Sequence, residues 1–300
     1  MSAPLRVGSR RSPLARVQTE WVLGRVARAA PEARFHRVFL DASGDRAPGR
    51  APDFTDTLDR ALLNGTLDLA VHSAKDLPAE LDPRLAIVAV PRRADARDCL
   101  VAATPRIARS PPRAARVGSS SPRRRAQLLR WRSDLEVVEV RGNVGTRIDL
   151  VRSGAIDAAI LAVAGVTRLG RAREIGRILP PTGFLPAPAQ GALAVVARAG
   201  EAGVASLAGR IDHRGTHAAV LAERAFASSL GGDCRLPLGA LATVRGRTLS
   251  LVGEVLAPDG RTSLRKRRRG STDGATALGT RLGRELGEQG AAELMAPARG

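Results

Sequence analysis

Aromatic residues are nearly absent from this sequence: it contains no tyrosine, and aromatic side chains make up 2% of its 300 residues. Because 44% of the residues are hydrophobic, the chain can still bury ordinary cores, which must then be aliphatic. The same scarcity leaves few surfaces on which nucleic-acid bases could stack. We therefore expect no nucleic-acid partner despite a formal net charge of +19, and we expect the densest basic tract, residues 265–269, to be a solvated strand or loop face.

Cysteine and histidine are also scarce. The two cysteines, Cys99 and Cys234, cannot form a disulfide framework and match no zinc-ligand spacing, and the four histidines show no metal-ligand pattern. Residues 2–13 contain no apolar signal-peptide core, and no apolar run approaches the roughly 20 residues that a membrane span requires. We therefore expect a cytoplasmic protein without a metal and without a membrane partner. Cys99 lies in an apolar stretch and is expected to pack in a core.

Lysine occurs only at Lys75 and Lys266, and all other basic residues are arginine. Lys75 and Asp76 follow an aliphatic stretch, residues 67–71, that is typical of a buried strand. They are therefore expected at the carboxyl end of that strand, where ligands of open α/β sheets bind. A carboxylate there could exchange protons with an amine or stabilise a developing cation. An ordinary Lys-Asp turn before Pro78 explains the segment equally well.

The chain contains two weak internal repeats in the same order. Residues 6–9 recur at 116–119, and residues 65–71 resemble residues 154–160. Each copy of the first repeat is followed by a Ser-Pro pair, a combination that favours a helix start because serine caps free N–H groups and proline needs no donor there. Apolar strands that alternate with helices indicate parallel sheets covered on both faces. We therefore expect two related α/β domains.

The last third of the chain has a different pattern. A helix is expected over residues 217–229, strands over 239–244 and 248–255, and a final helix over about 275–295. This order predicts a smaller α+β domain. The expected domains are residues 1–92 with 190–208, residues 93–189, and residues 209–300.

Arginines gather at the expected starts of helices. Three of them, at 123–125, fall in the first turn of a helix, where the partial positive charge of the helix end makes them unfavourable unless an anion is bound. A second basic loop covers residues 141–147, with Thr146 expected to cap the next helix, and a third covers residues 10–12. These loops predict a ligand with several negative groups, either phosphates or carboxylates.

A set of short segments resembles the porphobilinogen deaminase family, in the family's order and from about residue 5 to residue 295. The resemblance implies an α/β protein of three domains, of which the first two are like periplasmic type-2 binding domains with the active site in the cleft between them. It also implies a monomeric hydroxymethylbilane synthase, which joins four porphobilinogen molecules head to tail and releases ammonia. The segments are residues 10–15, 72–78, 118–124, 141–147, 161–165, 168–170, 190–192 and 223–225.

The resemblance also implies roles for individual residues. Asp76 would be the catalytic carboxylate, Cys234 would hold a dipyrromethane cofactor through a thioether, and Phe54 would belong to a lid over the site. The remaining residues would bind the carboxylates of cofactor and substrate. They are Arg10, Ser12, Lys75, Ser119, Ser120, Arg123, Arg124, Arg141, Arg147 and Arg168.

Two features depart from the family pattern. The loop at residues 46–53 is several residues shorter than usual and lacks its lysine, so only Phe54 corresponds. Asp233 stands where a glycine normally precedes the cysteine, and its charge should weaken cofactor binding or raise the pKa of the Cys234 thiol. These departures keep an alternative open, a non-catalytic paralogue of the same fold that binds a polycarboxylate tetrapyrrole.

Overall fold

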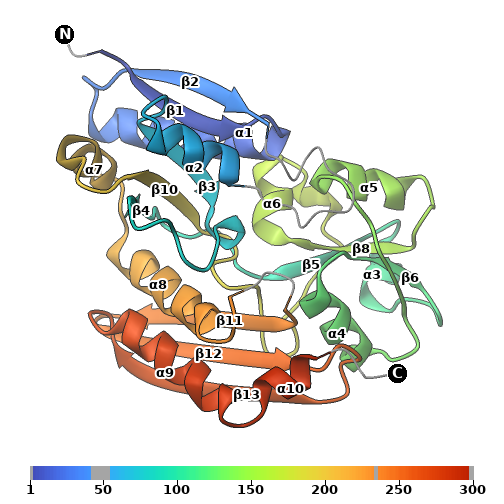
Figure 1. Ribbon diagram of the computed structural model, residues 1–300. Coiled ribbons are helices and arrows are strands. Elements are labelled where there is room, and N and C mark those ends of the chain that lie inside the picture. Colours follow the sequence, from blue (N-terminus) through green and yellow to red (C-terminus); the bar gives the residue numbers. More distant parts are fainter. Residues whose placement is uncertain (1–2, 42–54, 233–235, 297–300) are drawn as a thin grey trace. The chain divides into compact units, whose positions relative to one another are not determined.

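The computed structural model describes residues 3–41, 55–232 and 236–296 (Figure 1). The chain divides into two compact units, one formed by Met1–Ala94 and Ala192–His217, the other by Asp95–Gly191 and Ala218–Gly300. No helix within the described ranges is long and apolar enough to cross a membrane.

The first unit is built on a five-stranded sheet with the strand order β2-β1-β3-β10-β4. β1, β2 and β3 are parallel, and β10 runs antiparallel between β3 and β4. Val22 of α1 and Ala208 of α7 pack in one core cluster with Val7 of β1, whereas α2 covers the opposite face. The elements are β1 (Leu5–Arg10), α1 (Pro13–Ala29), β2 (Phe35–Leu40), α2 (Asp56–Leu63), β3 (Leu69–Ser73), β4 (Leu85–Ala89), β10 (Leu193–Arg198) and α7 (Ala202–Gly209).

The second unit contains a sheet of the same design, with the order β7-β6-β8-β5-β9. β6, β7 and β8 are parallel, and β5 runs antiparallel between β8 and β9. In each unit the antiparallel strand is the first one after the chain crosses from the other unit. The elements are β5 (Asp98–Ala102), α3 (Pro105–Arg109), β6 (Arg116–Gly118), α4 (Pro122–Trp131), β7 (Glu136–Val138), α5 (Val144–Arg152), β8 (Ala158–Ala162), α6 (Val163–Arg168) and β9 (Arg177–Ile178).

The predicted internal repeat is confirmed down to the pairing of single residues. Val7 and Gly8 pair with β3 in the same register in which Val117 and Gly118 pair with β8. Both glycines are required by close packing: a Cβ would come within 2.3 Å of a Leu67 methyl group at Gly8, and within 2.7 Å of an Ile156 methyl group at Gly118. Two sheets of the same order confirm the expected pair of related α/β domains.

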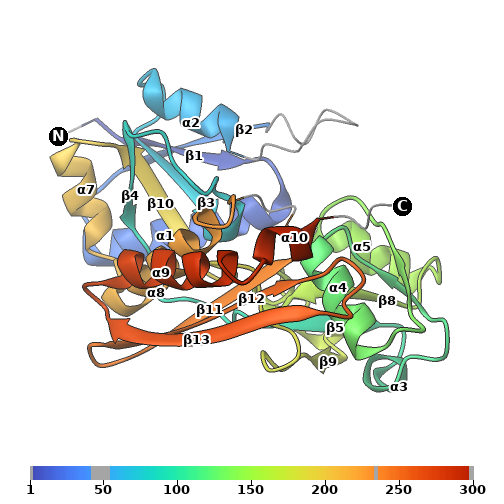
Figure 2. The same ribbon diagram turned by 60° about the horizontal axis from the view of Figure 1, so that its bottom comes forward.

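A third, antiparallel sheet lies in the second unit, with the order β11-β12-β13 and helices on one face (Figure 2). The expected α+β part is thus confirmed, with corrected boundaries. The helix expected from 217 begins at Arg214, and the expected final helix is broken before Ala291 because Gly290 has a left-handed φ of 86°. The elements are α8 (Arg214–Ser228), β11 (Leu238–Arg245), β12 (Thr248–Leu256), β13 (Ser263–Ser271), α9 (Ala275–Gly287) and α10 (Ala291–Met295).

Aliphatic side chains form most of each core, as expected from the composition. Phe226 is the main aromatic exception, fully buried among leucines and alanines beneath the third sheet. Cys99 is fully buried in β5, and burial raises the pKa of its thiol to about 12. The expectation that Cys99 packs in a core is therefore confirmed, and the basic tract at 265–269 lies within the edge strand β13.

Candidate active site

The first unit gathers its predicted site residues at one edge of the sheet. β1 and β3 are parallel neighbours that end at Arg10 and Ser73, so the segments that follow them meet at the same edge. Ser12 begins α1 there, because its Oγ accepts a hydrogen bond from the backbone N of Ala15 at 3.3 Å. The predicted residues at this edge are Arg10, Ser12, Lys75 and Asp76.

Lys75 and Asp76 lie in a single 3-10 turn, η2 (Ala74–Asp76), directly after β3. The turn is fixed by its apolar neighbours: Ala74 is 1% exposed and Leu77 is 7% exposed. The backbone N of Ala74 also donates to the backbone just before β10, at 3.1 Å. The half-buried Asp76 side chain is therefore carried by an anchored turn at the strand end.

His72 is the buried neighbour of this turn, and sequence reasoning gave it no role. Burial, and after it the positive charge of Arg10, lowers the pKa of His72 to about 4. Its Nε2 lies 4.0 Å from Oδ1 of Asp59, but the imidazole is neutral at pH 7 and forms no true ion pair there. His72 is therefore a buried, neutral side chain at pH 7, directly before the turn that carries Asp76.

The second unit brings further predicted residues to the equivalent sheet edge. Ser119 and Ser120 follow β6, and Ser121 caps α4. Arg147 reaches this loop from α5: its Nη2 donates to Oγ of Ser120 at 2.9 Å, and its Nε donates to the Gly142 carbonyl at 3.1 Å. The two basic loops that the sequence singled out in this unit are thus in direct contact.

Arg123 and Arg124 have a partner that sequence reasoning missed. Nη1 of Arg123 lies 2.8 Å from Oδ2 of Asp98, and Nη2 of Arg124 lies 2.6 Å from Oδ1. All three side chains are buried, with Asp98 0% exposed. The expectation that only a ligand would compensate the arginines in this first helical turn is therefore wrong, because the fold supplies one internal carboxylate.

The Asp98 carboxylate remains charged in this setting. Burial by itself would raise its pKa, but the charges and hydrogen bonds of Arg123 and Arg124 outweigh burial and hold the pKa well below its usual range. Nε2 of Gln190 adds a further hydrogen bond to Oδ1 at 2.9 Å. The sequence did carry a signal for this residue, since Asp98 is a lone charge at the start of an apolar strand.

Arg147 and Arg168 differ from that pair, because within the described ranges neither forms an ion pair with a carboxylate. Nη2 of Arg168 donates only to the Gly191 carbonyl, at 2.8 Å, and burial lowers its pKa to about 10. Burial, and then the charge of Arg124, also lowers the pKa of Arg147. Desolvated arginines without a counter-ion are unfavourable, so these two positions are suited to an anionic ligand.

The loop at 141–147 requires one correction. Asn143, not Thr146, caps α5, because Oδ1 of Asn143 accepts from the backbone N of Thr146 at 3.0 Å. The helix can begin this early because Gly142, with a φ of 95°, turns the chain just before the cap. Arg141 is exposed and pairs with the equally exposed Glu139, with Nε and Oε1 3.2 Å apart.

The residues of the second unit fit a ligand that carries several carboxylates. Besides Arg147 and Arg168, Nε of Arg123 is buried without an acceptor in the part of the chain that the structure describes. Guanidinium groups and serine hydroxyls are donors that suit carboxylates. Among the described residues, no group of three or more His, Cys, Asp or Glu side chains is placed to hold a metal ion.

Cys234, the expected attachment residue, Asp233 and the expected lid residue Phe54 lie outside the described residues. The chain leading to the cysteine is described as far as Gly232. Gly231 and Gly232 both have positive φ values, of 96° and 62°, which glycine tolerates best. Glu223 fixes the preceding helix, since its buried carboxylate accepts from the backbone N atoms of Ala189 and Ala242 at 2.6 and 2.7 Å.

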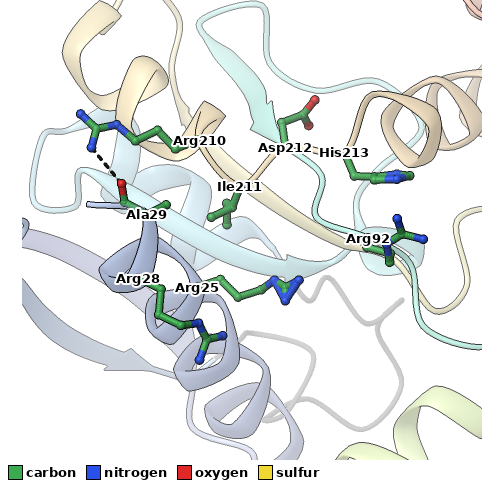
Figure 3. A pocket seen from close by; sticks show the side chains of 8 residues that line it. All are labelled: Arg25, Arg28, Ala29, Arg92, Arg210, Ile211, Asp212 and His213. Carbon is green, nitrogen blue, oxygen red and sulfur yellow. Dashed lines mark hydrogen bonds between the residues drawn. The ribbon is translucent and has the colours of Figure 1, made fainter. Parts of the chain in front are cut away.

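A pocket of about 410 Å³ in the first unit contains none of the predicted site residues (Figure 3). Two of its charged side chains are engaged internally: Nη1 of Arg210 donates to the Ala29 carbonyl at 3.0 Å, and Asp212 accepts from the backbone N of Val90 at 2.7 Å. The pocket is lined by Arg25, Arg28, Ala29, Arg92, Arg210, Ile211, Asp212 and His213.

Comparisons with known proteins cover nearly the whole chain. Residues 5–206 match the family model "Porphobilinogen deaminase, dipyromethane cofactor binding domain", and residues 217–288 match "Porphobilinogen deaminase, C-terminal domain". The porphobilinogen deaminase of Pelotomaculum thermopropionicum is 41% identical over 100% of this chain and 98% of its own length. That of Moorella thermoacetica is 43% identical over 97% of this chain and 95% of its own length. The chain belongs to the porphobilinogen deaminase family.

Proposed function

We propose that Asp76 and the arginines of the second unit carry out the reaction of this family. The enzyme is a transferase that joins four porphobilinogen molecules head to tail, releases ammonia at each step and forms hydroxymethylbilane. The observation that carries the proposal is that two equivalent sheet edges, one in each unit, present different functional groups. One edge presents the carboxylate of Asp76 on an anchored turn, and the other presents Arg147 and Arg168, which have no carboxylate partner among the residues that the structure describes.

The dipyrromethane cofactor fits the carboxylate-binding residues of the second unit. When bound, it supplies the pyrrole carbon to which the first substrate molecule is joined. We propose that Cys234 holds it through a thioether, since a thiolate readily attacks an electrophilic methylene carbon. Its carboxylates would be held by Ser119, Ser120, Arg123, Arg124, Arg141, Arg147 and Arg168, and from the first unit by Arg10, Ser12 and Lys75.

Asp76 would act on the substrate. The C–N bond of the protonated aminomethyl group breaks, ammonia leaves with the bonding electrons, and the methylene-pyrrole that remains carries the positive charge. An ionised carboxylate stabilises this cation, and it can accept the proton that the attacked pyrrole carbon loses once the new C–C bond has formed. Lys75, next to Asp76 on the same turn, would bind a substrate carboxylate and orient the reacting carbon.

The arginines would supply affinity for a product that gains two carboxylates with every pyrrole added. Guanidinium groups bind carboxylates through two parallel hydrogen bonds, which restricts orientation as well as position. Truncating one partner of such a buried pair costs about 2–5 kcal/mol. The second unit is therefore proposed to hold cofactor and growing chain while Asp76 acts at the reacting carbon.

The variant Asp76→Asn tests the catalytic role. It should keep its fold and cofactor mass but lose nearly all bilane formation from porphobilinogen, because an amide neither accepts the proton nor stabilises the cation. Asp82→Asn is the matched control: Asp82 lies in the same unit and pairs at the surface with Arg84. Full activity of the Asp76→Asn enzyme would contradict the assignment.

The same proposal includes a monomeric enzyme of the cytoplasm that needs no metal. Sedimentation of the purified chain and elemental analysis of the active enzyme test the first and last of these points. The alternative of a non-catalytic paralogue gains no support from the family models or the relatives. Formation of bilane by the purified chain would exclude that alternative.

A further inference from the structure

Glu254 is a fully buried carboxylate in β12 to which the proposed reaction gives no role. Its neighbour Val255 packs in the core beneath the helices, so Glu254 faces the other side of the sheet, where α4 contacts β12. Two donors come from α4. Nη1 of Arg130 lies 2.7 Å from Oε1, and Nε2 of Gln127 lies 3.3 Å from Oε2.

Gln127 connects this carboxylate to the arginine cluster at the start of α4. Its Oε1 accepts from Nη1 of Arg123 at 2.8 Å, while its Nε2 donates to Glu254 and, at 3.0 Å, to the Leu185 carbonyl. An ionised carboxylate can only accept and a guanidinium can only donate. Because Arg123 lies on one side of Gln127 and Glu254 on the other, the buried amide can adopt only the orientation that points its oxygen toward Arg123.

The fixed amide contributes to the position of Arg123. Nη1 of Arg123 is held by three acceptors: Asp98, Gln127 and the Leu185 carbonyl. Asp98 in turn accepts a hydrogen bond from Arg124, and the positive charge of Arg124 adds to burial in lowering the pKa of Arg147. A continuous series of hydrogen bonds thus leads from the third sheet to the proposed carboxylate-binding edge.

The balance of charge along this series also favours an anion. Arg123, Arg124, Arg130 and Arg265 carry four positive charges, whereas Asp98 and Glu254 carry two negative ones. Glu254 is shared by Arg130 and Arg265, and Asp98 is shared by Arg123 and Arg124, so the end that includes Arg124 keeps one positive charge in excess. A ligand carboxylate is the group that would balance it.

We infer that Glu254 is a positioning residue for the carboxylate-binding arginines, acting through the orientation of Gln127. The inference rests on the proposed function of those arginines and deepens it. The third sheet follows Cys234 in the chain and contains none of the proposed site residues. The inference gives this sheet a part in carboxylate binding.

A pair of substitutions that exchanges the two side chains tests the inference. In Glu254→Gln the buried amide of Gln127 is free to turn, and Arg123 loses an acceptor in part of the molecules. The Kd for porphobilinogen should rise about fivefold, the effect of one weakened hydrogen bond. In the double variant Gln127→Glu with Glu254→Gln, residue 127 again accepts from Arg123 and residue 254 can donate to it, whereas the Leu185 carbonyl loses its donor. This variant should therefore recover part of the lost affinity.

Calorimetry measures the Kd in the Asp76→Asn background, where porphobilinogen binds without turnover, and intact mass gives the fraction of chains that carry cofactor. Glu285→Gln is the matched control, because Glu285 pairs with Arg268 on the helix-covered side of the same sheet, 2.8 Å apart. An unchanged Kd in Glu254→Gln would overturn the inference. So would a double variant that recovers thermal stability but not affinity, since Glu254 would then be structural alone. Failure of the unsubstituted chain to form bilane would instead refute the proposed function.

Discussion

The two sheets share strand order and register but differ at one corner. Both antiparallel strands begin opposite the last residue of the middle strand, with Leu193 in the first unit and Asp98 in the second. The helices that follow β1 and β6 are both capped by serine, and the second residue after the cap is Leu14 in the first unit and Arg123 in the second. At these equivalent positions the first unit carries leucines, of which Leu193 is buried, and the second unit carries Asp98 and Arg123 of the buried ion cluster.

The difference shows that the ion cluster is not required by the fold. Burying charges costs desolvation energy that their attraction often only offsets, and apolar replacements of similar size are frequently as stable. The first unit demonstrates such a replacement within the same chain. The cluster in the second unit is therefore best explained by the ligand that its excess positive charge can bind.

The largest effect on stability is expected when Asp98 is replaced and the two buried arginines are kept. Asp98→Leu copies Leu193 but leaves Arg123 and Arg124 buried without their shared carboxylate, which should cost about 3–5 kcal/mol of unfolding free energy. The triple variant that also carries Arg123→Leu and Arg124→Ala copies the first unit completely and should recover most of that loss. Urea unfolding measures both. A single variant as stable as the parent would show that Asp98 does not compensate the arginines.

A pH effect of about 3 kcal/mol is expected from His72, whose counterpart in the second unit is Leu161. The folded-state pKa, about 4, lies below the unfolded value of about 6.5, so the unfolded chain binds the proton more readily. Stability should therefore fall as the pH drops from about 6.5 to about 4. His72→Leu should flatten that part of the stability–pH curve, whereas an unchanged slope would assign the effect to other groups.

Substitution of Arg168 should separate ligand affinity from the stability of the fold. Arg168→Leu removes a cation that has no carboxylate partner in the described part of the chain, so it should weaken porphobilinogen binding by about 2 kcal/mol, or about thirtyfold, without loss of stability. Calorimetry in the Asp76→Asn background gives the affinity. Equal affinity with a gain in stability would mean that Arg168 is not a ligand contact.

The smallest effect is expected for Arg141→Gln. Arg141 and Glu139 are both exposed, 74% and 66% respectively, and such surface pairs contribute about 0–1 kcal/mol to stability. Unfolding should be nearly unchanged, and any loss of porphobilinogen affinity would then report a ligand contact directly. A large loss of stability would show that the exposed pair supports the loop itself.

Features carried by local pattern were predictable from the sequence. The repeat of residues 6–9 at 116–119, the aliphatic cores and the strand ends that present Asp76 and the basic loops all depend on neighbouring residues. The cap of α5 was mistaken because Asn143 and Thr146 are both good capping residues, and only the turn at Gly142 decides between them.

The ion cluster could not be predicted in the same way. Asp98 meets Arg123 across 25 residues of sequence, and Glu254 meets Gln127 across 127. These pairings depend on how strands and helices pack, which spacing along the chain does not reveal. Asp98 and Glu254 are each the one charged residue of an otherwise uncharged strand. That pattern in the sequence could have indicated both buried carboxylates.

The most direct test is the intact mass of three purified chains: the parent, Asp76→Asn, and the triple variant with the apolar corner. If the second unit holds the cofactor and Asp76 acts only on substrate, the parent and Asp76→Asn will both carry a mass excess of two linked pyrrole units that maps to Cys234, and the folded triple variant will carry none. An equal excess on the triple variant would contradict the role given to the buried arginines.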